Sequence, residues 1–468
     1  MDDEDFTRDL RASLRRMAPD QVPSRLQARV DHSLATQSDA RASGRTSLRA
    51  FSGAASALVT VAIVAVLGVL FVGRPLGAPA GSPTATQSTE PTGFATGSPS
   101  ISEIPSTEPA AAIDWVRSSQ PAGVILTTAI QSGSGFLAFA SDLAAGGSAQ
   151  LWESADGLYW QPRPTPAAFA PAGSSTGMTV VAGVEQAAGF LVAVGTEQAA
   201  DSSSGQAAAW FSTDGGLTWA RALGQGMSDA TMTAVTAGPA GWVAVGSDGY
   251  PGASSSRTGS RGMAVWHSTD GRSWARVAGS AALRGSSIPD QIVSGGFGYL
   301  AGGQVSAGHS DAAPLWSSAD GSGWTRVRGV SVTSSHLARG QGASEVILVG
   351  DTSGGPVIWS STDGKSWSAA SLTPPPTTTM SLDAVGLASS VWVAAGVEVA
   401  NDGTPHINIW LSADTVTWHQ TAADPSFASS SAPLLIRGDG KVLIVAQAYD
   451  LNAALPHGYV WVGTPRRP

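Results

Sequence analysis

The chain has 468 residues, of which only 13% are charged, and it contains 56 glycines, 28 prolines and no cysteine. This composition favours short strands and turns over long helices, and it excludes disulfides, thiolate metal sites and a cysteine nucleophile. The formal net charge is −9, and acids outnumber bases most clearly after residue 74. Because an acidic surface repels nucleic acid, we expect no nucleic-acid partner.

The first part of the chain predicts a membrane anchor. Residues 51–73 (FSGAASALVTVAIVAVLGVLFVG) lack charged side chains and can cross a hydrocarbon core of roughly 30 Å as a helix. Arg41, Arg45 and Arg49 precede this segment, which by the positive-inside rule places the N-terminus in the cytoplasm and the rest outside. The alternative is a signal peptide cleaved near residues 78–80.

The segments that flank the anchor differ in composition. Residues 1–50 contain two short amphipathic stretches, which predict a solvated cytoplasmic head or a docking element for a regulatory partner. Residues 74–112 are rich in Pro, Ser and Thr and predict an extended stalk. Arg is far commoner than Lys, as in high-GC bacterial genomes, so we expect a single-pass protein of a bacterial plasma membrane.

Residues 113–468 repeat one pattern with a period of about 50 residues. A Trp is followed by Ser two positions on, Asp four positions on, usually Gly next, and a second Trp eight or nine positions on. The copies are LWESADGLYW (151–160), WFSTDGGLTW (210–219), WHSTDGRSW (266–274), WSSADGSGW (316–324), WSSTDGKSW (359–367) and WLSADTVTW (410–418). An apolar strand precedes each copy, which predicts the blades of a β-propeller.

The motif has a structural interpretation. Each Asp is expected to accept backbone N–H bonds within a hairpin turn, and the following Gly tolerates a positive φ. The predicted structural residues are Asp156, Asp214, Asp270, Asp320, Asp363 and Asp414. Thr415 replaces the Gly in the last copy, so that turn should be strained or differently shaped.

The Trp positions predict an all-β, seven-bladed propeller. Trp461, in GYVWVG (458–463), continues the series of first Trp residues, but the chain ends before an outer strand can follow. Residues 113–117 (IDWVR) resemble the outer strands WARV and WTRV. We therefore expect this N-terminal strand, with Trp115, to complete the last blade and close the ring.

The sequence STDGGLTW at 212–219 resembles the Asp-box, or bacterial neuraminidase repeat, and the resemblance covers residues 113–467. It implies a sialidase-like propeller whose Asp-boxes lie on the outer rim, away from the ligand. A sialidase also needs three Arg that clamp a carboxylate, a Tyr–Glu pair and an acidic Asp. Arg221, Arg276 and Arg326 instead occupy one repeated position, which indicates a structural role and a protein that is not an enzyme.

No cofactor or metal is expected, because the histidines lack short ligand spacings. Binding residues are expected in the loops opposite the Asp-boxes, at 197–207, 247–263, 303–313 and 397–408. The candidates are Asp248, Tyr250, Arg257, Arg261, His309, Asp311, Glu398, Asp402 and His406. The alternative is that these Ser/Gly-rich loops are only mobile.

The predicted function is a non-catalytic binding or scaffold propeller, anchored in the plasma membrane through residues 51–73. Its expected ligand is a glycan, a peptide or an envelope protein. One alternative is a glycoside hydrolase of the sialidase-like superfamily. Another is a transmembrane sensor whose cytoplasmic head binds a regulatory partner.

Overall fold

The chain divides into two compact units, residues 1–56 and 57–468. In the computed structural model the described residues are 113–119, 124–142, 149–170, 177–198, 205–248, 262–279, 281–284, 287–305, 315–330, 332–340, 345–352, 355–373, 380–399, 405–421, 424–427, 430–438, 441–448 and 457–466. The predicted head, anchor and stalk lie outside these residues and remain predictions. Within the described part, no helix has the length and apolar character needed to span a membrane.

The described residues form β-strands with a few short 3-10 helices. Most strands belong to four-strand antiparallel meanders. The first meanders are β2 (Val124–Ser132), β3 (Gly135–Asp142), β4 (Ala149–Ser154) and β5 (Gln161–Arg163); β6 (Met178–Ala187), β7 (Phe190–Gln198), β8 (Gln206–Ser212) and β9 (Ala220–Arg221); and β11 (Ala230–Gly238), β12 (Gly241–Asp248), β13 (Met263–Ser268) and β14 (Ser273–Arg276).

Further along the chain the same unit recurs. These meanders are β15 (Ser287–Gly295), β16 (Gly298–Val305), β17 (Leu315–Ser318) and β18 (Thr325–Arg326); β19 (Ser334–Arg339), β20 (Val346–Thr352), β21 (Gly355–Ser361) and β22 (Ser368–Ala369); and β24 (Met380–Ala388), β25 (Val391–Val399), β26 (Pro405–Ser412) and β27 (Thr417–Gln420). A single pairing, Gln304 with Ser334, joins β16 to β19 and merges two meanders into one eight-stranded sheet.

The last sheet combines both ends of the described part. It contains β28 (Ser430–Gly438), β29 (Lys441–Ala448), β30 (His457–Pro465) and β1 (Ile113–Ser119), with β1 on the edge. All seven residues of β1 pair antiparallel with β30, from Ile113 opposite Pro465 to Ser119 opposite Tyr459. An exposed ion pair between Asp114 and Arg466, with Nη2 to Oδ1 at 2.6 Å, lies where the other meanders have a covalent turn.

Short connecting elements cover the outer strands of other meanders. β10 (Leu223–Gly224) and β23 (Ser371–Thr373) add parallel fifth strands beside β14 and β27. The 3-10 helices η1 (Ala167–Phe169), η2 (Ala281–Leu283) and η3 (Pro425–Phe427) each bury one apolar side chain.

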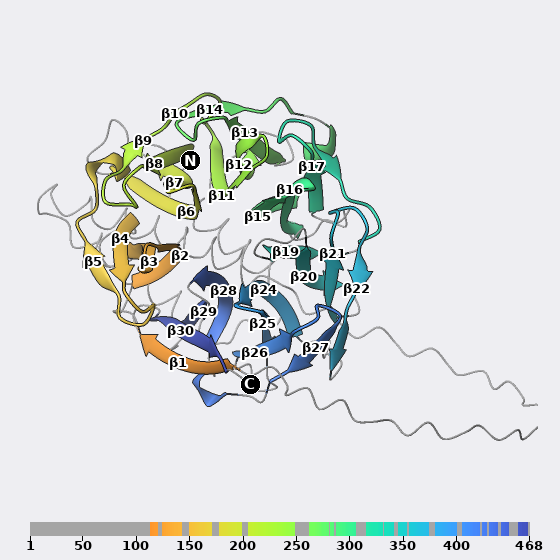
Figure 1. Cartoon of the computed structure of the whole chain (residues 1–468). Coiled ribbons are helices and arrows are strands. Elements are labelled where there is room, and N and C mark those ends of the chain that lie inside the picture. Colours follow the sequence, from red (N-terminus) through yellow and green to blue (C-terminus); the bar gives the residue numbers. More distant parts are fainter. Residues whose placement is uncertain are drawn as a thin grey trace, which may run out of the picture. The chain divides into compact units, whose positions relative to one another are not determined.

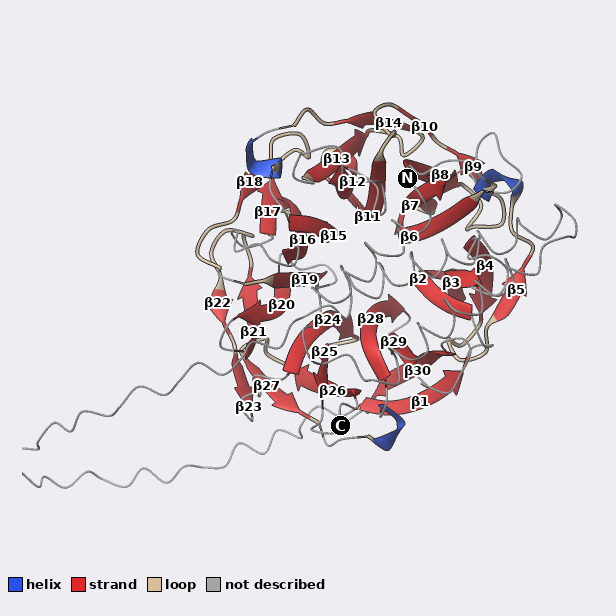
Figure 2. Ribbon diagram, turned by 180° about the vertical axis from the view of Figure 1, so that it is seen from behind, coloured by secondary structure: helices blue, strands red, loops and turns tan. Residues whose placement is uncertain are grey.

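The sheets of the second unit surround a common centre, and the first strand of each meander is innermost (Figure 1). The same arrangement is visible from behind, with the short outer strands at the periphery (Figure 2). The second strands, such as β7, β12 and β25, are almost continuously buried because both of their faces contact neighbouring sheets. The prediction of an all-β, propeller-like fold is therefore confirmed.

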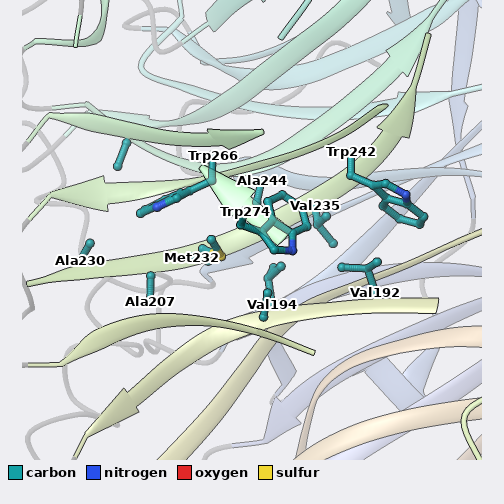
Figure 3. Close-up of a cluster of buried hydrophobic side chains, with 12 residues drawn as sticks. Val192, Val194, Ala207, Ala230, Met232, Val235, Trp242, Ala244, Trp266 and Trp274 are labelled. Atoms are coloured by element: carbon teal, nitrogen blue, oxygen red, sulfur yellow. The ribbon is translucent and has the colours of Figure 1, made fainter. Parts of the chain in front are cut away.

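The core lies between successive sheets. Between the β6–β9 and β11–β14 sheets, Val192 and Val194 of one sheet face Met232, Trp266 and Trp274 of the next (Figure 3). Trp266 is fully buried and Trp274 is 2% exposed. Because burying a large aromatic side chain stabilises a fold by several times what an alanine does, the repeated Trp residues carry much of this packing.

Candidate ligand-binding face

The antiparallel topology gives every meander two different ends. At one end, here called the turn side, lie the hairpins between the first and second strands and between the third and fourth strands. At the other end, the loop side, lie the connections between the second and third strands and those that lead to the next meander. The six Asp turns belong to the turn side, and every predicted binding loop belongs to the loop side.

Each Asp turn forms the hydrogen bonds that the sequence predicts. Asp270 Oδ1 accepts the backbone N–H groups of Arg272 and Ser273, both at 2.8 Å, and the Ser268 hydroxyl at 3.0 Å. The N–H of Gly271 donates to Ser268 Oγ at 2.9 Å. Because these bonds favour the carboxylate, with the Ser273 N–H as the largest contribution, the pKa of Asp270 is lowered.

The other turns follow the same scheme. The Thr218 hydroxyl and N–H lower the pKa of Asp214 to about 2, and the Ser366 N–H is the main cause that lowers the pKa of Asp363 to about 2. A carboxyl whose pKa is lowered on folding contributes stability above its ordinary pKa of 3.8. That contribution is lost as the pH falls towards 2, so the turns weaken only in strong acid.

The Asp turns also contact the preceding sheet, which the sequence analysis did not predict. Gly271 has a φ of 70°, and a Cβ added to it would lie 2.6 Å from the ring of Phe190 in β7. Thr415 occupies the equivalent position with a φ of 65°, so its backbone is strained as expected. Its turn keeps the common hydrogen bonds, and Thr415 Oγ1 donates to Glu345 Oε1 of the preceding sheet at 2.8 Å.

We expect the substitution Asp270→Ala to lower the free energy of unfolding by about 0.5–2 kcal/mol, as the loss of a side-chain cap does in helices. The reason is that two backbone N–H groups and one hydroxyl lose their acceptor. Urea denaturation followed by tryptophan fluorescence measures the change. Abolished ligand binding by a variant that remains folded would contradict the assignment of the Asp turns to the side away from the ligand.

The structure describes three of the predicted binding residues. Asp248 ends β12, Glu398 lies near the end of β25, and His406 lies near the start of β26, so all three are on the loop side. Glu398 and His406 are register partners, whereas Asp248 belongs to a different sheet. The remaining candidates lie outside the described residues and stay predictions: Tyr250, Arg257, Arg261, His309, Asp311 and Asp402.

Asp248 forms a salt bridge within its own sheet. The guanidinium of Arg276, at the end of β14, pairs with the Asp248 carboxylate and lies over the ring of Trp266, 5.5 Å from the centroid. Glu197 and Arg221 form the equivalent pair in the preceding meander at 2.8 Å, with the Glu197 side chain almost fully buried. These ion pairs connect the ends of the second and fourth strands on the loop side.

Glu398 is also held by neighbouring side chains. Asn408 Nδ2 donates to Glu398 Oε2 at 3.0 Å, and Gln420 Nε2 donates to Asn408 Oδ1 at 3.1 Å. This row crosses β25, β26 and β27 and replaces the acid–arginine pair of other meanders. Sequence reasoning missed Glu197, Asn408 and Gln420, which lie on a second, a third and a fourth strand. Aligning the loop-side ends of these strands in each repeat could have found them.

The arginines at the ends of the fourth strands contact groups on neighbouring strands. Arg326 lies over Trp316, with its Cζ 5.1 Å from the ring centroid, and donates to the carbonyl of Arg284 at 3.0 Å. Among the residues that the structure describes, no group of three or more His, Asp or Glu side chains could hold a metal ion.

No protein-family model matches this sequence, and no curated protein matches it either. Solved structures that are similar to it include the phage phi92 endosialidase (TM-score 0.43, 11% identity, 76% of this chain and 70% of that one). YjhT has a TM-score of 0.42 and 9% identity, with coverage of 75% and 99%. The Trypanosoma rangeli sialidase has a TM-score of 0.36 and 15% identity; the match covers 65% of this chain and 56% of that enzyme.

Proposed function

We propose that the chain is a seven-bladed propeller of Asp-box repeats, closed by β1, which a membrane anchor at residues 51–73 displays outside a bacterial cell. It binds a glycan, a peptide or an envelope protein through its loop side and catalyses no reaction. The repeated meanders and the pairing of β1 with β30 support the blade count and the closure.

The observation that carries this proposal is the position of Ile113, the first residue of β1. Ile113 begins β1 opposite Pro465, at the end of β30, and this end of the sheet belongs to the turn side. A tether that precedes residue 113 therefore joins the turn side and leaves the loop side open to a partner. The pairs Asp248–Arg276 and Glu197–Arg221 give that side a fixed frame from which loops can project.

Cell fractionation tests the anchor. With a C-terminal tag, we expect the full-length chain in the membrane fraction, and we expect protease added outside intact cells to remove the tag, because residues 51–73 would hold the chain with its C-terminal part outside. A soluble secreted product that starts near residue 81 would contradict the anchor and favour a cleaved signal peptide.

Binding to isolated cell envelopes tests the loop side. We expect the wild-type chain to be retained, and we expect retention to fall at least about tenfold when a short Gly-Ser linker replaces residues 249–261, since a hot-spot loop contributes on the order of 1.4 kcal/mol or more. Asp270→Ala, on the turn side, is the matched control and should bind as the wild type does. Loss of binding by the Asp270→Ala control alone would mean that the turn side, not the loop side, faces the ligand. Turnover of a fluorogenic sialoside would favour the alternative function of a glycoside hydrolase.

A further inference from the structure

A β-bulge places an extra residue at the same register position in several innermost strands. In β2 this residue is Thr127, in β11 it is Thr233, and in β15 it is Asp290. Each is partly exposed and lies where one meander meets the next. The corresponding extra residues of β6 and β24 are Ala182 and Asp383. The repeat therefore allows the Asp290 carboxyl group to be compared with threonine hydroxyl groups in the same structural position.

The two threonines link neighbouring innermost strands. Thr127 Oγ1 donates to the carbonyl of Val181 in β6 at 2.7 Å, and Thr233 Oγ1 donates to the carbonyl of Pro289 in β15 at 2.8 Å. In both cases the donor is a side chain of one meander and the acceptor is the backbone of the next. At these two bulges the side chain therefore acts as a hydrogen-bond donor.

Asp290 has one oxygen paired and one oxygen buried. Gln304 Nε2 donates to Asp290 Oδ2 at 3.2 Å, while Oδ1 is shielded from solvent and accepts no hydrogen bond from the described residues. Burial is the main cause that raises the pKa of Asp290 to about 7. A neutral carboxyl group has an O–H that can donate, which a carboxylate lacks.

The register of β19 identifies the acceptor. The carbonyls of Val181 and Pro289 accept the threonine hydrogen bonds, and each of these two residues pairs with a glycine of the second strand in its meander. In β19 the residue that pairs with such a glycine is Ser335, which lies opposite Gly350. A Cβ built on Gly302 would lie 2.6 Å from the Ser335 carbonyl oxygen, so this oxygen approaches β16 beside the bulge.

We propose that Asp290 is a proton-operated latch between the β15–β18 and β19–β22 meanders, in which the neutral carboxyl donates through Oδ1–H to the Ser335 carbonyl. Ionisation removes the donor and leaves a negative charge facing a carbonyl oxygen, so the junction loosens as the pH rises. The same junction contains the pairing of Gln304 with Ser334, and Gln304 also holds Asp290 Oδ2.

The strands packed against β15 carry few other ionisable groups. Among the described residues they are Asp248 on β12, His267 on β13, Tyr299 on β16, and His336 and Arg339 on β19. Asp248 pairs with Arg276, and Arg339 donates to a backbone carbonyl of β15. Burial, rather than any of these charges, has the largest effect on Asp290.

The sign of the pH dependence follows from the raised pKa. The folded chain holds the Asp290 proton up to a pH of about 7, whereas an unfolded chain releases it near 3.8. The stabilisation is therefore fully present below 3.8 and is lost as the pH rises through about 7. Within that window the equilibrium constant of unfolding should rise by up to about tenfold per pH unit.

Urea unfolding of the full-length chain at several pH values between about 5 and 8 tests the latch. Asp290→Asn keeps the shape and supplies N–H donors, and Asp290→Thr introduces the hydroxyl group found at the bulges of β2 and β11. Both variants should lose most of the wild-type pH dependence and be more stable than the wild type at the upper end of the range. Thr233→Val should lower stability equally at every pH, and His336→Gln should keep the wild-type slope.

A slope in Asp290→Asn and Asp290→Thr equal to that of the wild type would overturn the proposal. A wild-type slope that disappears in His336→Gln would overturn it too, because the proton would then belong to the histidine. If neither Asp290 variant folds, the proposal is tested by following the ¹³C chemical shift of the Asp290 carboxyl group in the wild-type chain as the pH changes. A midpoint near 7 supports the latch, and a midpoint near 4 excludes it.

Discussion

A chain that begins at Gln120 should aggregate or unfold at a much lower temperature than a chain that begins at Thr107. The shorter chain lacks β1, so β30 loses every one of its seven pairings on that side and becomes an unprotected edge. An exposed edge strand invites pairing with other chains, which is why aggregation is one of the expected outcomes.

The side chains of β1 add to this loss. Trp115 packs edge-on against Phe427 with ring centroids 5.5 Å apart, and Phe427 in turn stacks on Trp461 at 4.9 Å. Arg117 Nη1 donates to the Ser426 carbonyl at 3.1 Å. Truncating a packed Trp to Ala typically costs about 3–5 kcal/mol, so we expect a loss of several kcal/mol from β1 as a whole.

Scanning calorimetry and size-exclusion chromatography of the two chains measure the effect. Trp115→Ala in the longer chain is a useful intermediate, because it removes the ring and keeps the backbone pairing. It should therefore unfold between the two. Equal melting temperatures for the chains that begin at Thr107 and Gln120 would contradict the proposed closure by β1 and the proposed count of seven blades.

The substitution Gly246→Ala should be among the most destabilising single changes in the domain. Gly246 lies opposite the bulge of β11, and a Cβ at this position would lie 1.8 Å from the carbonyl oxygen of Thr231. The clash is with backbone in the middle of a sheet, so a side-chain rotation cannot relieve it. Overpacking of this kind costs roughly 1–3 kcal/mol, and backbone shifts can raise that cost further.

Gly279→Ala is the matched control, because nothing lies within 4 Å of a Cβ built there. Its unfolding free energy should stay within about 0.5 kcal/mol of the wild type. Urea denaturation of both variants under the same conditions makes the comparison. Equal stability of the two variants would show that the bulge in β11 can open without cost, and the explanation given for the repeated glycine would then fail.

The same reasoning explains a glycine that recurs in the apolar strands, which the sequence analysis described only as preceding each copy of the motif. Gly195 and Gly396 also lie opposite a bulge of the first strand, with a built Cβ 1.8–1.9 Å from a backbone carbonyl oxygen. The sequence shows that a small residue recurs. It does not show the bulge, which is a property of the pairing between two strands.

Local interactions were predictable from the sequence. Asp270 bonds to groups two and three residues further on, and the same spacing holds at Asp320 and Asp363. Such a turn depends only on short-range backbone geometry, so its residues identify it wherever they recur. The apolar runs that precede each motif predicted strands for the same reason, because a short run of apolar residues is a local property of the sequence.

The candidate site was predictable only in outline. The repeat order places the loops opposite the Asp turns, and Asp248, Glu398 and His406 lie at that end of the strands. The sequence did not indicate that Asp248 pairs with Arg276 or that Glu398 is held by Asn408. These partners come from other strands, and their meeting depends on strand register.

By itself, then, the sequence determined the strand repeat, the Asp turns and the end of each repeat where loops gather. Only the tertiary structure decided which groups meet between meanders, such as Thr415 with Glu345 and Thr233 with the Pro289 carbonyl. The physical reason is that a turn is stabilised by atoms a few residues apart. A contact between sheets depends on bulges and on packing distances that accumulate over a whole repeat.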